Sequence, residues 1–300
     1  MLAGILVGGI VLIVLMGGIY FSQQVIKPKC FKYEETYKIE VDKGKIVEEK
    51  FNSLKREEIK IKSPYGYELN TMYFEVPNSN KAVIICHGIT YTLYGSVKYM
   101  DIFLKRGISV LIYDHRNHGL SGGKNTTFGH YEKYDLKAVT DWLFTRLGDG
   151  GKVGIMGESM GAATVLLNSE IDDRVSFYIA DCSYSSMSDI LKYRMRKDFH
   201  IYPFLLYYSA SLITKIRAGI FFREVSPIKA VKNVETPIFF IHGKNDDYVP
   251  YQMSIDMYNA KKNGFKKIYL APNAGHAEAY WNNRDEYDRL VGEFLEQIGF

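Results

Sequence analysis

The stretch KVGIMGESMGAATVLLN, residues 152–168, contains the pattern that decides the fold. Its apolar start, Lys152–Met156, is typical of a buried strand, and Ala162–Asn168 has helical composition. Between them lies GESMG, a G-x-S-x-G pattern centred on Ser159. In this strand–turn–helix context the turn is so tight that bulky residues two positions on either side of the serine would clash. The pattern therefore predicts a Ser159 hydroxyl raised above a sheet, at a helix N-terminus whose dipole favours negative charge.

Outward from this turn, short apolar runs alternate with helical stretches. Runs bounded by turn residues suit strands that are buried on both faces of a parallel sheet. The runs are Ala82–Cys86, Val110–Tyr113, Val153–Met156, Phe177–Ala180, Ile238–Ile241 and Ile268–Ala271, and helical stretches lie at Tyr99–Arg106, Tyr134–Arg146 and Asp285–Gln297. An alternating strand at Ile59–Ile61 and another at Tyr67–Phe74 are joined by a Pro-Tyr-Gly turn. This order predicts a doubly wound α/β sheet that opens with an antiparallel hairpin.

One interval is too long for a simple crossover. About fifty residues separate the strands at Phe177 and Ile238, and residues 183–235 are rich in aromatic side chains. An insertion of this length predicts a helical cap over the carboxyl ends of the strands, where open α/β sheets bind ligands.

The N-terminal segment differs from the rest of the chain. Leu2–Phe21 carries no charge, and as a helix it would be about 30 Å long, the thickness of a bilayer core. A cleaved signal peptide is disfavoured because no basic residue precedes the run and no A-x-A-like site follows it. We therefore expect an uncleaved single-pass anchor at residues 1–26. Lys27, Lys29 and Lys32 follow it, so the positive-inside rule places the bulk of the protein in the cytoplasm.

The remaining boundaries follow from composition. Residues 27–55 are charged and weakly periodic, which favours a linker with a short helix, and residues 56–300 form the main domain. Length alone predicts about two domains, at ~150 residues each. With 47% hydrophobic and 24% charged residues, the chain is not disordered, and a net charge of +4 is too small to indicate a nucleic-acid partner. The chain contains no metal-ligand spacing, P-loop or dinucleotide pattern, so we expect no metal and no cofactor.

A serine hydroxyl needs a base, and for this turn type the base follows the serine and the acid in chain order. Three histidines come after Ser159: His200 in the expected cap, His242 at a strand end, and His276 in the loop after the last strand. His276 can reach the carboxyl edge of the sheet, so it is the candidate base.

The acid that orients the base has three candidates. Asp246 and Asp247 share the loop after the strand Ile238–Ile241, and Asp181 ends the preceding strand. Asp246 is favoured, and the other two remain open. Its expected task is to fix the histidine tautomer and stabilise the imidazolium.

An oxyanion hole needs two backbone N–H groups that point to one position. One is expected from Met160, directly after the serine. The other is expected from Ile89, in the loop His87-Gly88-Ile89-Thr90 that follows a strand.

These segments together resemble the serine α/β-hydrolases, in particular their monoglyceride-lipase-like and acyl-peptidase-like branches. The similar segments are HGIT at 87–90, YDHRNHGLSGG at 113–123, GESMG at 157–161, HGKNDDYVP at 242–250 and AGHAEAY at 274–280. The resemblance implies an α/β-hydrolase fold, with a mostly parallel eight-stranded sheet, helices on both faces and a cap insertion. It also implies a Ser159–His276–Asp246 triad, and it marks Asp114, Arg116 and His118 as structural.

The function expected from these features is hydrolysis of carboxylic esters, with an apolar ester or lipid as substrate and the bilayer as partner. An acylaminoacyl- or dipeptidyl-type peptidase with the same triad is the alternative. An acyltransferase and a non-catalytic module are less favoured, the latter because the serine, aspartate, histidine and both turn glycines are intact.

Overall fold

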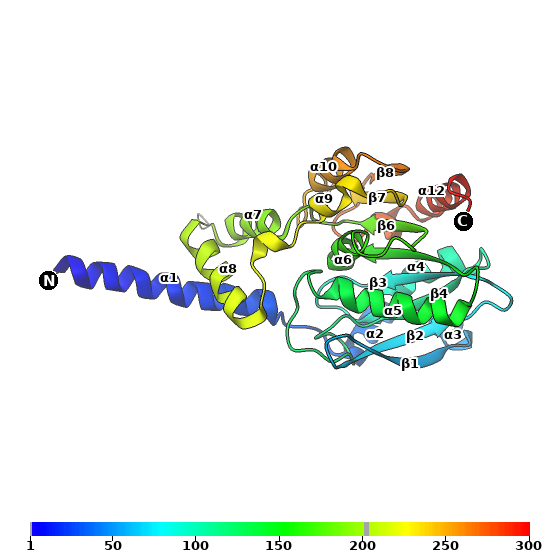
Figure 1. Cartoon of the computed structure of the whole chain (residues 1–300), viewed down its shortest axis with the longest axis horizontal. Helices are drawn as coiled ribbons and strands as arrows, with labels where there is room; N and C mark the ends of the chain where they lie inside the picture. The colour runs from blue at the N-terminus through cyan, green and yellow to red at the C-terminus, as the bar shows by residue number, and fades with distance from the viewer. Residues whose placement is uncertain (1, 201–203) are drawn as a thin grey trace.

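A computed structural model describes residues 2–200 and 204–300 of the chain (Figure 1). Its centre is a single eight-stranded sheet in the order β1-β2-β4-β3-β5-β6-β7-β8. β1 and β2 pair antiparallel and β2 is antiparallel to β4, whereas β3 to β8 run parallel to their neighbours. This confirms the predicted mostly parallel sheet with an opening hairpin. The strands are β1 (Glu57–Lys62), β2 (Glu68–Phe74), β3 (Lys81–Cys86), β4 (Ser109–Tyr113), β5 (Lys152–Glu158), β6 (Phe177–Asp181), β7 (Ile238–Gly243) and β8 (Lys266–Ala271).

The apolar runs form strands because both of their faces are covered. In β3, Val83 and Ile85 pack into one hydrophobic cluster, and Ile84 and Cys86 pack into the other. The first cluster lies under α4 (Val97–Leu104), α11 (Ala279–Asn282) and α12 (Arg284–Gln297), and the second under α5 (Glu132–Leu147), α6 (Met160–Asn168) and α10 (Gln252–Ala260). A 3₁₀ turn, η1 (Leu93–Ser96), leads into α4.

Residues 27–55 differ from the expected linker. They contain two helices, α2 (Tyr33–Asp42) and α3 (Glu48–Ser53). Ile46, between the two helices, and Phe51, within α3, are each 3% exposed. Both side chains belong to the hydrophobic cluster under α4 and α12. The segment is therefore packed on the sheet domain; its few buried apolar residues are spaced too irregularly to give a helical period.

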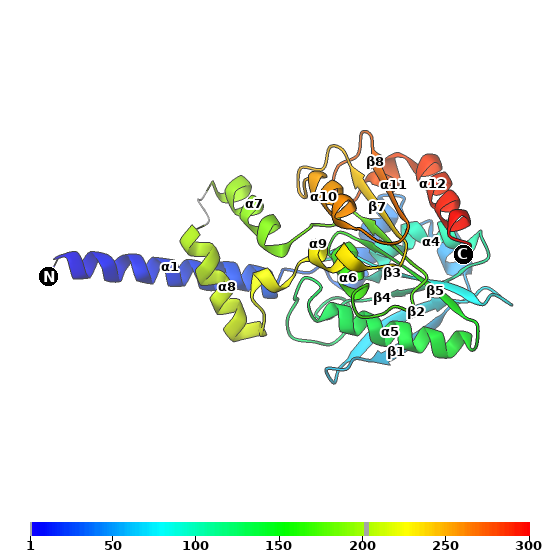
Figure 2. The same ribbon diagram turned by 45° about the horizontal axis from the view of Figure 1, so that its top comes forward.

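The insertion between β6 and β7 is helical, in the position expected for a cap. It contains α7 (Met187–Phe199), α8 (Phe204–Ala218), α9 (Pro227–Ala230) and the 3₁₀ turns η2 (Phe222–Glu224) and η3 (Val231–Asn233). α7 and α8 lie beyond the sheet, beside the N-terminal helix (Figure 2).

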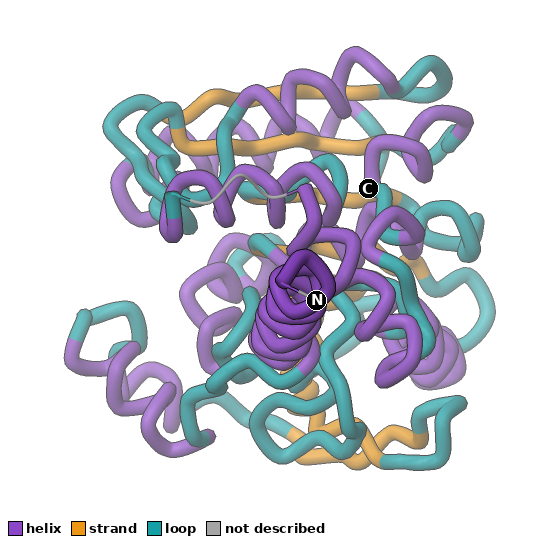
Figure 3. Tube along the Cα trace, turned by 90° about the vertical axis from the view of Figure 1, so that its left-hand side faces the viewer, coloured by secondary structure: helices purple, strands orange, loops and turns teal. Residues whose placement is uncertain are grey.

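The N-terminal helix α1 (Leu2–Ile26) projects from the domain (Figures 1 and 3). By length and composition, Ile5–Ile26 is long and apolar enough to cross a membrane. The C-terminal end of α1 packs against the domain, since Val25 and Ile26 are buried. Its second half packs against α8, where a Cβ atom on Gly18 would lie 2.1 Å from the Ser209 hydroxyl.

Candidate active site

The turn between β5 and α6 holds Ser159 in a strained backbone conformation. Its φ is 55° and its ψ is −115°, and its N–H donates to the carbonyl of Asp181 at 2.8 Å. The flanking glycines are explained by close backbone contacts. A Cβ atom on Gly157 would lie 2.4 Å from the carbonyl carbon of Gly161, and one on Gly161 would lie 2.2 Å from the Cys86 oxygen. Strain of this kind persists where the surrounding structure fixes it, and it is characteristic of functional sites.

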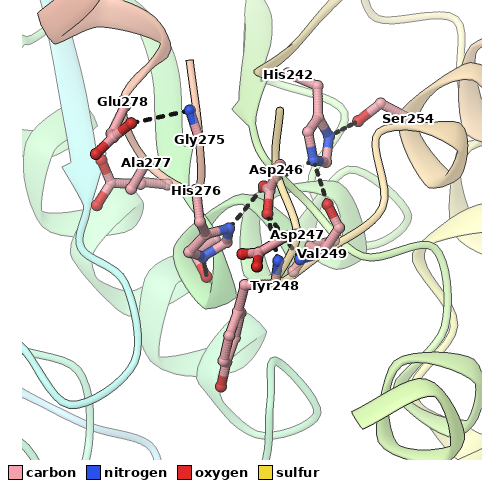
Figure 4. Close-up of polar contacts among 12 residues, drawn as sticks. His242, Asp246, Asp247, Tyr248, Val249, Ser254, Gly275, His276, Ala277 and Glu278 are labelled. Atoms are coloured by element: carbon pink, nitrogen blue, oxygen red, sulfur yellow. Dashed lines mark hydrogen bonds and ion pairs between the residues drawn. The ribbon is translucent and has the colours of Figure 1, made fainter. Parts of the chain in front are cut away.

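Ser159, His276 and Asp246 form a hydrogen-bonded series. The Ser159 Oγ lies 2.9 Å from Nε2 of His276. Nδ1 of the same ring lies 2.7 Å from Oδ2 of Asp246, a contact drawn in Figure 4. An ionised carboxylate can only accept, so Nδ1 carries the ring proton and Nε2 is free to accept from the serine hydroxyl. The structure thus brings together three of the residues selected from the sequence, in an arrangement that can activate the hydroxyl.

Asp246 is buried, and its carboxylate is stabilised by hydrogen bonds from protein groups. Oδ1 accepts from the N–H groups of Tyr248 at 2.9 Å and Val249 at 2.8 Å, and Oδ2 accepts from two histidines. Burial acts to raise the pKa of Asp246, but the hydrogen bonds from His242 and His276 outweigh it and hold the pKa well below its usual range. The group is therefore a stable anion beside the His276 ring.

The other two acids lie elsewhere. The Asp247 side chain is 85% exposed and pairs with Lys197 of α7 at 3.2 Å. Asp181 is buried behind the turn, where its Oδ2 accepts from Tyr287 at 2.9 Å and Tyr99 at 3.2 Å. Among the hydrogen bonds of the described residues, Asp246 supplies the carboxylate that reaches His276.

His242 is a part of the site that the sequence did not reveal. Its Nε2 lies 3.0 Å from Oδ2 of Asp246 and 2.9 Å from the Val249 carbonyl, and its Nδ1 lies 2.7 Å from the Ser254 hydroxyl (Figure 4). Two acceptors around Nε2 place the proton there, so His242 donates to the carboxylate and Ser254 donates to Nδ1. The sequence contains this pair as His-x-x-x-Asp at the end of a strand, a spacing that by itself does not indicate a hydrogen bond.

The expected oxyanion donors lie beside the serine. Ile89 and Met160 both line the cavity that contains Ser159. A Cβ atom on Gly88 would lie 3.5 Å from the Ser159 Cβ, so the loop that carries Ile89 approaches the nucleophile closely at this glycine. Met160 begins α6, whose N-terminus carries partial positive charge.

The serine opens into an apolar cavity of about 330 Å³. α7 contributes Ile190, Leu191 and Met195, and the β4–α5 loop contributes Phe128. Four residues of α1 also line it: Tyr20, Phe21, Gln24 and Val25. The volume and the apolar lining are typical of a site for a small organic molecule.

A second group of residues behind the turn was also missed. Glu158, directly before the nucleophile, forms a buried ion pair with Lys98 of α4 and accepts from the Tyr99 hydroxyl at 2.6 Å. The Lys98 Nζ also donates to the carbonyl of Ala277 at 3.4 Å, next to His276. Lys98 therefore connects the loop of the serine with the loop of the histidine; in the sequence it resembles any lysine on an amphipathic helix.

One cysteine lies in a cluster of side chains that are possible metal ligands. Cys182 lies near Asp246 and His276, with possible ligand atoms of the three within 4.8 Å of one another. Burial raises the pKa of the Cys182 thiol well above its ordinary value, and the other two groups already bond to each other. Their mutual hydrogen bond accounts for this cluster without an ion, and all three cysteines of the chain are unpaired.

Comparisons with known proteins agree with this chemistry. Residues 96–299 match the family model of the prolyl oligopeptidase family, Peptidase_S9. The chain is 40% identical over 294 residues to the uncharacterised protein YqkD of Bacillus subtilis, covering 97% of this chain and 96% of that one. It is 25% identical over 240 residues to the lysophosphatidylserine lipase ABHD12 of Bos taurus, covering 75% of this chain and 58% of the lipase.

Solved structures show the same fold. The esterase Pf2001 of Pyrococcus furiosus is 25% identical, with a TM-score of 0.68, and the match covers 83% of this chain and 93% of the esterase. The acylaminoacyl peptidase of Pyrococcus horikoshii is similar in fold, with a TM-score of 0.61 at 20% identity over 82% of this chain and 42% of that one. With two thirds of its length matched by the family model, the chain belongs to the prolyl oligopeptidase family and is a serine hydrolase of the α/β-hydrolase type.

Proposed function

We propose that this protein hydrolyses carboxylic esters through Ser159, His276 and Asp246. The observation that carries the proposal is the hydrogen-bonded series of these residues, whose serine lines an apolar cavity. Ester hydrolysis by these three residues requires neither a charged ligand nor a phosphate-binding loop.

The proposed reaction has two halves. Ser159 Oγ attacks the acyl carbonyl while His276 Nε2 takes its proton, and the N–H groups of Ile89 and Met160 stabilise the oxyanion. The imidazolium then protonates the leaving alkoxide, which departs and leaves an acyl-enzyme. Water, deprotonated by His276, releases the acid and restores the serine. Asp246 stays ionised throughout, since its pKa lies far below neutral pH.

The cavity indicates an apolar acyl group. Its lining is mainly aliphatic and aromatic, and its ion pair, Arg194 with Asp198, lies at the α7 side. The relationship to a lysophosphatidylserine lipase supports an amphiphile with one acyl chain, such as a monoglyceride or a lysolipid.

We also propose that α1 anchors the protein in a membrane with the catalytic domain in the cytoplasm. The length and hydropathy of α1 support the anchor, and Lys27 and Lys29 directly after it support the orientation.

The triad is tested by Ser159→Ala. The variant is expected to lose p-nitrophenyl butyrate hydrolysis by about 10⁴-fold or more, because attack and proton transfer act as a unit. It is also expected to lose labelling by a fluorophosphonate. Ser183→Ala is the control, since Ser183 is buried nearby and its hydroxyl donates to a neighbouring carbonyl, that of Tyr184, at 3.0 Å. Full activity of Ser159→Ala would exclude the mechanism.

A second candidate is a peptidase with the same triad, which the family match favours. Parallel assays of p-nitrophenyl esters and acylaminoacyl anilides separate the two activities. Anilide turnover that equals or exceeds ester turnover would identify the peptidase.

A further inference from the structure

We propose that α8 lies in the membrane beside α1, and that the last turns of α1 form a wall of the acyl site, so that a membrane-resident ester enters directly from the bilayer. This inference rests on the proposed hydrolase function and extends it: the anchor becomes a part of the binding site.

The depth of α8 follows from its contacts with α1. At 1.5 Å per residue, about twenty residues cross the hydrocarbon core, so a span that begins at Leu2 ends near Phe21. α8 packs on the second half of this span: Ser209 Oγ donates to the Val14 carbonyl at 3.0 Å, and Leu206 lies against Gly17. If Val14 and Gly17 lie within the bilayer, Leu206 and Ser209 lie at the same depth.

The outer face of α8 is suited to that position. Four large apolar residues recur every four positions, so they form one stripe along the helix. They are Phe204, Tyr208, Leu212 and Ile216, and 63%, 57%, 53% and 77% of their surfaces are exposed. In water such an exposed apolar stripe would favour aggregation, whereas its contact with lipid acyl chains is favourable.

Charged groups mark where the bilayer ends. α8 carries no acidic residue, and its basic residues, Lys215 and Arg217, lie in its last turn. There α8 meets the end of α1, since Thr214 Oγ1 donates to Ser22 Oγ at 3.0 Å and Arg217 bonds Gln23. Lys27 follows within the next turn. Both helices thus change from apolar to basic at one level, as expected at anionic headgroups.

The acyl cavity reaches that same level. Its α1 wall, Tyr20 to Val25, begins where the apolar span ends. Phe21 packs edge-to-face on Phe199 of α7, with ring centroids 5.0 Å apart. An ester whose acyl chain lies in the bilayer would therefore meet the cavity without crossing water, and the residues of α1 would contact the bound chain.

The test uses the full chain in phosphatidylcholine vesicles and two esters, soluble p-nitrophenyl butyrate and membrane-resident p-nitrophenyl palmitate. Leu212→Glu places a charge in the exposed stripe; we expect palmitate hydrolysis to fall at least about tenfold and butyrate hydrolysis to stay unchanged. Val47→Glu is the matched control and should alter neither activity, because Val47 is 60% exposed and directly precedes α3, a helix at the end of the domain far from α8 (Figure 1).

A second measurement does not depend on turnover. The fluorescence of the tryptophan introduced by Tyr208→Trp is expected to be quenched by brominated lipids. The fluorescence of the tryptophan introduced by Tyr134→Trp, on α5 of the sheet domain, is expected to remain unquenched. Quenching at 208 with selective loss of palmitate turnover in Leu212→Glu supports the inference.

Absence of quenching at 208, or unchanged palmitate turnover in Leu212→Glu, overturns it. If Leu212→Glu loses both activities through misfolding, the quenching at position 208 decides whether α8 lies in the membrane. Failure of the proposed function is a separate outcome, namely a wild-type chain that hydrolyses neither ester.

Discussion

Lys98 connects the loop of Ser159 with the loop of His276. Its side chain is 4% exposed, and it pairs with Glu158 and bonds the Ala277 carbonyl. Burial acts to lower the pKa of Lys98, but the Glu158 carboxylate outweighs it and raises the pKa, and Lys98 in turn lowers the pKa of Glu158 against its burial. Both groups are therefore charged in the folded protein, and each neutralises the other.

Lys98→Met is expected to destabilise the protein by about 3–5 kcal/mol, because it leaves the Glu158 carboxylate buried and unpaired. The double variant with Glu158→Gln should recover a large part of the loss, since no charge then remains. Urea unfolding of the full chain in detergent measures both. Equal stability of the single and double variants would show that the two side chains are not coupled.

Asp181 gives the site a pH-dependent stability. Burial, and next the nearby Glu158 charge, raise its pKa to about 6 despite the hydrogen bond from Tyr287. The folded state thus holds the Asp181 proton more tightly than the unfolded state. Its contribution to stability is fully present below about pH 4 and is lost as pH rises through about 6.

Asp181→Asn imitates the protonated form at every pH, so the variant does not lose this stability as the pH rises. We expect its stability relative to wild type to improve by up to about 3 kcal/mol between pH 4 and pH 8. Asp173→Asn, which is exposed on a loop, is the control. A constant difference between Asp181→Asn and wild type across this range would contradict the proposed burial of a protonated acid.

Among the elements, the packing of α1 on α8 depends on small residues at particular positions. A Cβ atom on Gly18 would lie 2.1 Å from the Ser209 hydroxyl and 2.9 Å from Ile213, whereas nothing lies within 4 Å of such an atom on Gly8. Gly18→Leu is therefore expected to separate the helices and to lower the turnover of p-nitrophenyl palmitate several-fold, and Gly8→Leu to be tolerated.

The two variants form a matched pair within one helix, because they make the same change at different depths. Reconstitution yield and palmitate turnover of each variant measure the effect. If Gly8→Leu were as harmful as Gly18→Leu, helix flexibility or association of two chains through Gly8 would explain the result better than contact with α8.

The sequence predicted the elements that repeat a simple period, and it missed those defined by tertiary contacts. Each buried strand was visible because a parallel strand is apolar on both faces. α2 and α3 were not, since Ile46 and Phe51 are two isolated anchors in a charged segment. The contact of α1 with α8 was also hidden, because no local feature distinguishes Gly17 and Gly18, where α8 packs, from the other glycines of the helix.

The site divides in the same way. Ser159, Asp246 and His276 could be selected because turn chemistry and chain order restrict them to a few positions. Lys98 acts through neighbours that are distant in the sequence, so its side chain has no local signature. His242 lies only four residues before Asp246, but this spacing alone does not indicate that the two side chains form a hydrogen bond. The α1 wall of the cavity could not be foreseen for the same reason, since nothing in Phe21 or Val25 indicates that they face Ser159.

At the scale of the whole molecule, charge is distributed unevenly. Residues 184–234 contain nine basic and three acidic residues, 9 − 3 = +6, which leaves −2 for the rest of a chain of net charge +4. Several of the basic residues lie at the ends of α7 and α8: Arg196, Lys197, Lys215 and Arg217. Lys215 and Arg217 lie in the last turn of α8, where Arg217 bonds Gln23 of α1, and with Lys27 and Lys29 they form a basic zone, as expected for a face that rests on an anionic leaflet.

This zone determines the expected orientation in the membrane. Basic residues are retained on the cytoplasmic side, and Lys27, Lys29 and Lys32 follow directly after α1. In a bacterial host, a C-terminal green fluorescent protein fusion should therefore fluoresce, and a C-terminal alkaline phosphatase fusion should be inactive. The control variant carries Lys27, Lys29 and Lys32 changed to Gln and three lysines inserted before Leu2. Because the charge difference across α1 is then reversed, its fluorescence should fall and its phosphatase activity should rise. Phosphatase activity in the wild-type fusion would place the catalytic domain outside the cell, and the basic zone would then need another partner.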